Sequence, residues 1–281
     1  KQIDGEIVNC DSIQIYKYLD IGSAKPTKEK MMKVPHHLYD FADPREQLTV
    51  AEYQKIALKT IDEIIRRGKT PIICGGTGLY LNSILYDMDF ALKNENIERR
   101  KELERLGEKN GPNYLHEHLA AVDPETAQRI HPNNVRKVIR AIEAWELGSK
   151  IKPMNNCKPN TTYDFKFFGI TMDREWLYDR INRRTLKLVK QGLIDEVSKL
   201  RDFGINSDVS SMKAIGYKEI YLYLDGKSSL KEAITDVMRN TRHYAKRQLT
   251  WLRRYDNITW IEIQKGDRLS NIVLQIINGG K

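Results

Sequence analysis

The sequence predicts an α/β fold in which a parallel sheet is flanked by helices and interrupted by an all-helical insertion. The first part of the chain runs strand, helix, strand, glycine loop, helix, an order typical of a parallel α/β sheet. Strand-like runs then disappear between about residues 90 and 150, and one returns at 165–171. The length of 281 residues agrees with about two domains, or with one domain that carries a large insertion.

The elements of the first part follow from local patterns. Residues 5–10 form a short apolar run that we expect to be a buried strand. Thr49 and Glu52 form a capping box that begins a helix, and Gly68 stands where a left-handed carboxy-terminal cap belongs. Residues 71–74 fit a second buried strand, and a helix is expected from Leu79. The apolar stripe of the first helix is expected to be Val50, Tyr53, Ala57, Ile61, Ile64 and Ile65.

The insertion is predicted to contain helices at 97–108, 114–121 and 134–147. A polar segment with two prolines, 151–164, is expected to be an exposed loop, and a strand is expected at 165–171. Helices follow at 174–191, closed by Gly192, at 212–224 and at about 229–254, and a last strand at 258–263. We therefore expect residues 1–90 and 161–281 to form the α/β core and 91–160 the insertion.

Composition excludes several classes of protein. A hydrophobic fraction of 40% is too high for a disordered chain. The charged fraction of 30% and the lack of an apolar run of about 18 residues exclude a membrane-spanning protein. Three distant cysteines fit neither a disulfide framework nor a zinc site, and no basic-then-apolar leader opens the chain, so we expect a cytoplasmic protein. The net charge of +9 permits a polyanionic partner without requiring one.

Two short segments could carry chemistry at the ends of the predicted strands. Asp11 and Ser12 follow the first strand, and ligands of open α/β sheets bind beyond the carboxyl ends of strands. An aspartate there is also a common cap of the next turn. Residues 75–80, Gly-Gly-Thr-Gly-Leu-Tyr, join a strand to a helix, where glycines let the backbone approach an anion and Thr77 could donate to a ligand. Tight strand-to-helix turns use the same residues for geometry alone.

Two basic stretches contain no acidic residue. They are residues 129–140 and 239–254, and in the second Arg239, Arg242, Lys246 and Arg253 share one helix face. Uncompensated positive charge with interleaved Tyr244 and Trp251 favours a nucleic-acid backbone, with rings available for stacking. A basic helix that binds an acidic protein is the alternative.

Arg180 and Arg184 lie one helical turn apart and are suited to clamp a phosphate-rich ligand, although a plain surface helix would look similar. His36, His37 and His131 have no carboxylate or cysteine at ligand spacing, so a protein-held metal set is not predicted. No Ser-His-Asp arrangement supports covalent catalysis.

Taken in order, these blocks resemble the tRNA dimethylallyltransferase family. The resemblance covers about residues 5–260 and is to the bacterial type, since no Cys/His finger follows the basic helix. The matching blocks are 11–16 (DSIQIY), 20–26 (DIGSAKP), 35–37 (PHH), 75–80 (GGTGLY), 131–134 (HPNN), 136–143 (RKVIRAIE), 214–219 (AIGYKE) and 244–251 (YAKRQLTW).

The resemblance implies a P-loop-NTPase-like core and a helical insertion that grips the anticodon stem of tRNA. It implies transfer of a dimethylallyl group from dimethylallyl diphosphate to N6 of the adenosine 3′-adjacent to the anticodon, with Mg²⁺, by a protein that we expect to be monomeric. Asp11 is then the general base, and Thr77, Arg180 and Arg184 complete the catalytic set. The segments implied to contact tRNA contain Asp11, Ser12, Ile13, Gln14, Thr77, Arg136, Lys137, Arg140, Lys213, Gly216, Tyr217, Lys218, Arg242, Lys246, Arg247, Gln248, Trp251 and Arg253.

One implied element is absent from the sequence. The family carries a Gly-x-x-x-x-Gly-Lys-Ser/Thr loop that holds the diphosphate, and Gly226-Lys227-Ser228 has no glycine five residues earlier. Because the sheet begins at a strand expected in its middle, we interpret this as an amino-terminal segment missing from the sequence. Two other classes stay open at this stage: a prenyltransferase or kinase that acts on free adenine nucleotides, and a non-catalytic RNA-binding protein.

Overall fold

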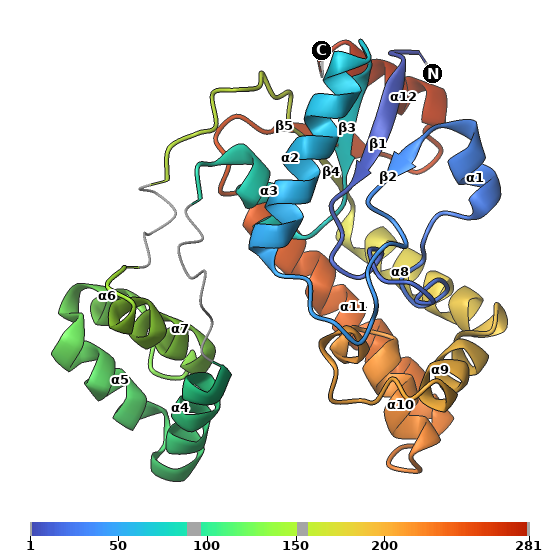
Figure 1. The fold of residues 1–281 in the computed structure, drawn as a ribbon. Helices are drawn as coiled ribbons and strands as arrows, with labels where there is room; N and C mark the ends of the chain where they lie inside the picture. The colour runs from blue at the N-terminus through green and yellow to red at the C-terminus, as the bar shows by residue number, and fades with distance from the viewer. Residues whose placement is uncertain (1, 89–96, 151–156, 280–281) are drawn as a thin grey trace. The chain divides into compact units, whose positions relative to one another are not determined.

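The computed structural model describes residues 2–88, 97–150 and 157–279, and the chain divides into two compact units (Figure 1). One unit comprises residues 1–85 and 161–281, and the other residues 86–160. No helix in the described ranges is both long enough and apolar enough to cross a lipid bilayer.

The first sheet of the larger unit contains three parallel strands in the order β2-β1-β3. They are β1 (Gly5–Asn9), β2 (His36–His37) and β3 (Thr70–Cys74). Helix α2 (Val50–Arg66) connects β2 to β3 and packs on the sheet together with α3 (Gly78–Leu85) (Figure 1). The buried residues of this layer are Val8, Cys10, Tyr53, Ala57, Ile61, Ile64, Tyr80 and Ile84. The parallel arrangement and the strand–helix–strand order confirm the predicted α/β class.

The start of α2 is as predicted, but the expected apolar stripe is too long. Thr49 and Glu52 form a complete capping box, and Gly68 has a left-handed φ of 71°. Ile65 is 45% exposed, because it lies on the side of the helix that faces away from the cluster, whereas its neighbour Ile64 is fully buried in it. The prediction that 71–74 is a buried strand is wrong in part. The strand forms, but Ile72 and Cys74 are exposed because β3 has one described neighbour and is covered on one face.

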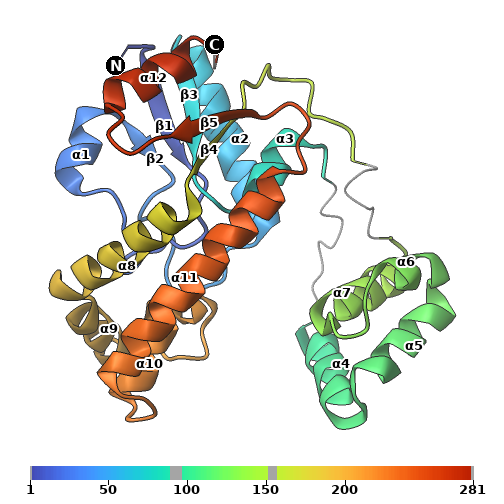
Figure 2. The ribbon, with the colours of Figure 1, turned by 180° about the vertical axis from the view of Figure 1, so that it is seen from behind.

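A second parallel sheet contains β4 (Phe168–Met172) and β5 (Thr259–Ile263) (Figure 2). The strand expected at 165–171 therefore begins three residues later. Between these strands lie α8 (Arg174–Lys190), α9 (Leu193–Asp202), α10 (Tyr217–Leu224) and α11 (Leu230–Leu252), and α12 (Leu269–Ile277) follows β5. Helix α11 packs against α3, α8 and α10.

The helix predicted at 212–224 is interrupted. A short 3-10 helix covers Ser210–Lys213, and α10 begins only at Tyr217 because Gly216 has a φ of 95° and caps the new helix. Helices α9, α12 and α1 (Lys28–Lys33) were not predicted. A second apolar cluster joins the segment after β1, through Ile15 and Leu19, to α9 and α10.

The smaller unit is helical in its described part. It contains α4 (Ile97–Asn110), α5 (Pro112–Val122), α6 (Pro124–Arg129) and α7 (Val135–Glu146), and three of these helices were predicted. Leu103, Leu115, Leu119, Val138 and Ile142 fill its core. Residues 89–96, where the insertion was expected to begin, and 151–156 of the expected loop lie outside the described residues.

Candidate functional site

Asp11 lies just beyond the carboxyl end of β1 and is half-buried. Its Oδ1 accepts the backbone N–H groups of Ile13 (2.8 Å) and Gln14 (3.3 Å), so the carboxylate does cap the following turn. Within the described part of the chain, Oδ2 has no hydrogen-bond partner. Burial raises the pKa of Asp11, while the two N–H groups and the Arg184 guanidinium act in the opposite direction. One oxygen is thus anchored, and the other is free to accept a proton.

A buried asparagine, which the sequence interpretation missed, orients Asp11 from the strand side. Asn9 is fully buried, its Oδ1 accepts the N–H of Asp11 (3.0 Å), and its Nδ2 donates to the carbonyl of Leu38 (2.9 Å). The hydroxyl of Tyr53 on α2 donates to the carbonyl of Asn9 at 2.8 Å. The available signal was a polar residue inside a strand predicted to be buried, where a polar side chain needs a partner.

The glycine loop at 75–78 packs directly on the segment that carries Asp11. The Thr77 hydroxyl accepts the Ser12 N–H (2.9 Å) and lies 3.2 Å from the Ser12 hydroxyl, while the Thr77 N–H donates to the Cys10 carbonyl (3.1 Å). A Cβ on Gly75 would lie 2.2 Å from the backbone of Cys10. The structure therefore brings the two predicted segments together, and Gly75 is needed for that close approach.

Helix α11 covers the other side of the same loop. Gln248 Nε2 and the Tyr244 hydroxyl both donate to the Gly76 carbonyl, at 3.2 and 3.4 Å. A Cβ on Gly78 would lie 2.4 Å from Trp251 Nε1. Burial, and next the Asp11 charge, raise the pKa of Tyr244. The loop is thus enclosed between the end of β1 and α11.

This packing gives the aromatic rings of α11 a structural task. Trp251 and Tyr244 are half-buried against the glycine loop, and the Arg254 and Arg247 guanidinium groups lie 5.0 and 5.7 Å from their respective ring centroids. Their rings therefore pack on the loop and hold it in place.

The two predicted arginines lie exposed on α8. Arg184 is close enough to Asp11 to lower the pKa of the carboxyl, and Arg180 lies over the Trp176 ring, 5.3 Å from its centroid. Arg242 reaches across from α11 and donates to Asn182 of α8 at 2.7 Å. Arg184 is therefore the cation that acts on the Asp11 carboxylate, and Arg242 joins α11 to α8.

Four predicted residues lie around the start of α10, and the structure separates them into two pairs. Lys213 and Lys218 are exposed. Gly216 and Tyr217 are buried, which corrects their predicted place in a tRNA-contacting surface. Gly216 is buried because it caps α10, and Tyr217 because its ring fills the cluster between α9, α10 and the segment after β1.

Acidic side chains just outside the two basic stretches lie close to some of their arginines. Arg239 pairs with Asp236 at 2.8 Å, one turn before the stretch begins, and Arg140 lies 3.7 Å from Glu143, one turn after the other stretch ends. Lys246, Arg247 and Arg253 on or just after α11, and Arg136 and Lys137 on α7, have exposed side chains. Each unit therefore displays cations of its own.

The described residues contain no group of three or more His, Cys, Asp and Glu side chains that could hold a metal ion. Asp11 is the carboxylate at the site, and Ser12 and Thr77 add hydroxyl oxygens beside it. Because Mg²⁺ commonly uses one or two carboxylates together with substrate phosphates, this donor set fits a magnesium ion carried by a phosphate-bearing substrate. It does not fit a cage made by protein groups alone.

The sequence pattern of the IPP transferase family matches residues 14–255. The tRNA dimethylallyltransferase of Alkaliphilus oremlandii is 48% identical over 283 aligned residues, which span 100% of this chain and 90% of the relative. That of Caldanaerobacter subterraneus is 47% identical over 92% of this chain and 84% of the relative.

Solved structures of tRNA-prenylating enzymes are also similar to this chain. The tRNA isopentenylpyrophosphate transferase of Bacillus halodurans superimposes with a TM-score of 0.73 at 44% identity, covering 99% of this chain and 89% of that one. A eukaryotic dimethylallyltransferase acting on tRNA superimposes with a TM-score of 0.83 at 25% identity, covering 99% of this chain and 73% of that one.

Proposed function

The chain belongs to the IPP transferase family and is a tRNA-prenylating enzyme, and we propose that Asp11 is its general base. The observation that carries the proposal is the half-bound carboxylate at the end of β1, with Oδ1 fixed by two backbone N–H groups and burial raising the pKa of the group. A base of this kind accepts a proton at a defined place.

The acceptor explains why a base is needed. Adenine N6 is a weak nucleophile because its lone pair is delocalised into the ring. As N6 forms a bond to C1 of the dimethylallyl group, the C1–oxygen bond breaks and diphosphate leaves with that electron pair. The proton released from N6 goes to Asp11 Oδ2, while Thr77, on the glycine-loop side, is placed to orient the base edge. To reach a half-buried carboxylate, the adenine must leave its stack, which costs a few kcal/mol.

The leaving group needs positive charge at the opposite end of the reacting bond. We assign this task to Arg180 and Arg184 of α8, of which Arg184 is electrostatically coupled to Asp11. A magnesium ion bound with the diphosphate would neutralise part of the developing charge. The Ser12 hydroxyl is the oxygen donor beside Asp11 that could approach such an ion.

The tRNA surface is proposed to consist of the exposed cations of both units. Arg136, Lys137 and Arg140 contribute from the helical insertion, and Lys213, Lys218, Lys246, Arg247 and Arg253 from the α/β unit. Such contacts hold the phosphate backbone and set the salt dependence of binding. Gln248 acts indirectly, because its side chain holds the carbonyl of Gly76.

Membership of the family decides between the classes left open by the sequence. A nucleotide kinase, a prenyltransferase of free adenine nucleotides and a non-catalytic RNA-binding protein all give way to a tRNA prenyltransferase. We further propose that the enzyme acts as a cytoplasmic monomer with dimethylallyl diphosphate as donor and the adenosine 3′-adjacent to the anticodon as acceptor.

The deciding experiment incubates the full-length enzyme with unmodified tRNA, dimethylallyl diphosphate and Mg²⁺. Mass analysis of the anticodon-loop fragment should show the mass of one dimethylallyl group on that adenosine, with release of one diphosphate for each transfer. AMP in place of tRNA should give no product. A modified AMP, or a dimethylallyl group on another nucleotide, would contradict the proposed acceptor.

A further inference from the structure

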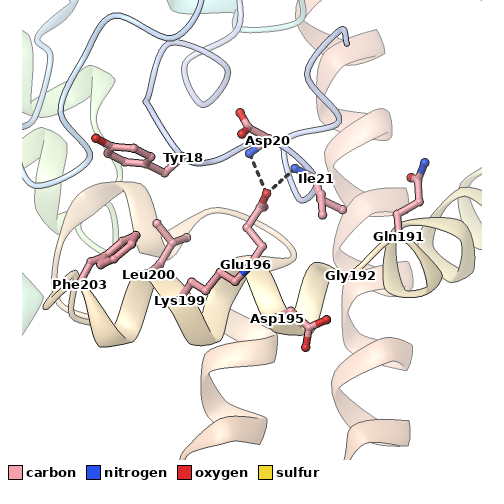
Figure 3. A pocket seen from close by; sticks show the side chains of 10 residues that line it. All are labelled: Tyr18, Asp20, Ile21, Gln191, Gly192, Asp195, Glu196, Lys199, Leu200 and Phe203. Atoms are coloured by element: carbon pink, nitrogen blue, oxygen red, sulfur yellow. Dashed lines mark hydrogen bonds between the residues drawn. The ribbon is translucent and has the colours of Figure 1, made fainter. Parts of the chain in front are cut away.

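Glu196 lies on α9, outside every predicted site segment, yet its carboxylate holds a distant loop. Its Oε2 accepts the backbone N–H groups of Asp20 (3.0 Å) and Ile21 (2.7 Å), and its Oε1 accepts that of Gly22 (3.0 Å). Figure 3 shows the carboxylate pointing from α9 to this loop, at the edge of a cavity of about 340 Å³. Three successive N–H groups form a cradle of the kind that binds anions, and here the anion is a side chain of the same chain.

Tyr217 completes the attachment from α10. Its hydroxyl donates to Glu196 Oε1 (2.8 Å) and accepts the N–H of Ser23 (3.1 Å). A Cβ on Gly22 would lie 2.6 Å from the Tyr217 ring, so glycine is needed there. Burial, and next the Glu196 charge, raise the pKa of Tyr217 well above its usual range, which keeps the hydroxyl a donor. Four successive backbone N–H groups, 20–23, are therefore bound by two side chains.

The held loop is in turn bonded to the segment that carries Asp11. The Ser23 carbonyl accepts Gln14 Nε2 at 3.0 Å, and the Gln14 N–H is one of the two donors on Asp11 Oδ1. A second connection runs through Lys25, whose ammonium donates to the Tyr16 carbonyl at 2.8 Å. The path from Glu196 to the Asp11 carboxylate thus passes through one loop and one glutamine.

Stability alone does not explain a carboxylate at this place. The apolar cluster already joins Ile15 and Leu19, after β1, to Leu193, Val197 and Tyr217. Taking a carboxylate out of water beside that cluster is costly, and apolar packing often replaces such a group without loss of stability. What the carboxylate adds is direction, because its two oxygens fix the orientation of three peptide groups.

We propose that Glu196 is a positioning residue for prenyl transfer, holding the loop at 20–23 and, through Gln14, the Asp11 carboxylate. This inference rests on the proposed role of Asp11. It extends the functional machinery to α9 and gives the buried Tyr217 a part in it.

The test is Glu196→Gln in the full-length enzyme, with Asp195→Asn as the matched control. Asp195 lines the same cavity on the same helix, so its substitution removes the same charge without touching the loop. In Glu196→Gln the new NH₂ group faces a backbone N–H instead of accepting it. We expect kcat to fall by about tenfold or more, while KM for dimethylallyl diphosphate and the Kd for tRNA stay within about twofold. The hydrogen bond from the Gln14 N–H to Asp11 Oδ1 lowers the pKa of Asp11 and should be weakened in this variant. The acid limb of the kcat–pH profile should therefore move to higher pH.

Backbone amide exchange gives a readout that needs no activity. Glu196→Gln should speed exchange at residues 20–22 and also at 13–14, and Asp195→Asn should do neither. Tyr217→Phe, which removes one hydroxyl, should produce a smaller change of the same kind and serves if Glu196→Gln does not fold. Faster exchange at 20–22 with unchanged exchange at 13–14 and unchanged kcat would overturn the proposal, as would an equal loss of kcat in Asp195→Asn. An inactive wild-type enzyme would contradict the proposed function, while exchange at 13–14 would still report whether Glu196 acts on the Asp11 segment.

Discussion

Replacing Asp11 by asparagine separates the two tasks that the structure gives to this residue. The asparagine Oδ1 can keep both hydrogen bonds, from the N–H groups of Ile13 and Gln14, so the turn after β1 should be retained. The NH₂ group then takes the position of Oδ2, where it cannot accept a proton. Only the base is lost, and removal of a general base costs about 10²- to 10⁴-fold in rate, or about 3–5 kcal/mol of transition-state stabilisation.

Although Asp11→Asn should lose activity, it should not lose stability. Because burial raises the folded-state pKa of Asp11, its stabilising contribution is present below the unfolded-state pKa and is lost as pH rises through the folded-state pKa. At neutral pH the ionised carboxylate therefore lowers the free energy of unfolding, and Asp11→Asn should unfold at the same temperature as wild type or at a higher one. That difference should disappear in acid, where the wild-type carboxyl is also neutral.

The assay is single-turnover transfer of a labelled dimethylallyl group to saturating tRNA, together with thermal unfolding and a tRNA Kd. Asp43→Asn is a suitable control because Asp43 Oδ1 also accepts a backbone N–H two residues on, that of Arg45 at 2.9 Å. The control should keep wild-type turnover. Turnover of Asp11→Asn within about threefold of wild type, with normal tRNA binding, would refute the assignment of Asp11 as base.

Three further predictions follow from single contacts. Arg184→Gln should raise KM for dimethylallyl diphosphate and, because Arg184 lowers the pKa of Asp11 in the free enzyme, should move the acid limb of the kcat/KM–pH profile to higher pH; an unmoved limb would show that the two charges do not interact. Gly75→Ala should cost about 100-fold in kcat, since its Cβ would lie 2.2 Å from the backbone of Cys10 and would displace the adjoining Asp11, whereas Gly76→Ala meets only the movable end of the Gln248 side chain; equal losses would contradict this account. Hydrogen bonds from Arg67 and then His37 lower the pKa of Glu6, so Glu6 should stabilise the fold above its unfolded-state pKa and lose that contribution as pH falls through its folded-state pKa. Urea unfolding of Glu6→Gln and wild type should therefore converge in acid, and a pH-independent difference would count against the ion pair.

The parts of the fold that the sequence predicted are those with a strong local signal. The capping box of α2, the glycine that ends α8 and the periodic insertion helices depend on residues within a turn or two of each other. The sequence does not indicate helix α9, because Gly192 by itself predicts only the end of α8. In the structure its φ of 101° ends one helix and begins the next, and a single glycine does not distinguish these cases.

The same distinction between local and long-range signals applies to the candidate site. Asp11 and Thr77 stand in motifs that can be recognised by eye, and both lie where parallel strands end. The contacts that Glu196 and Tyr217 make with the loop at 20–23 join residues 174–194 positions apart, so no local pattern could indicate them. Tyr217 stands in a recognisable motif that predicts a contact with tRNA, but its side chain is buried. A motif records which residue is present and not what that residue contacts.

The arrangement around Asp11 also couples the base to the donor. Its pKa reflects three effects: burial raises it, and the backbone N–H groups and then Arg184 lower it. The N–H contribution comes from the two bonds that hold Oδ1 and thereby fix the position of Oδ2. The Arg184 contribution can change, because a diphosphate bound at Arg184 would neutralise the guanidinium and remove its effect on the carboxyl. Asp11 would then be a stronger base with donor bound than without it, so that the adenine loses its proton only where a leaving group is in place.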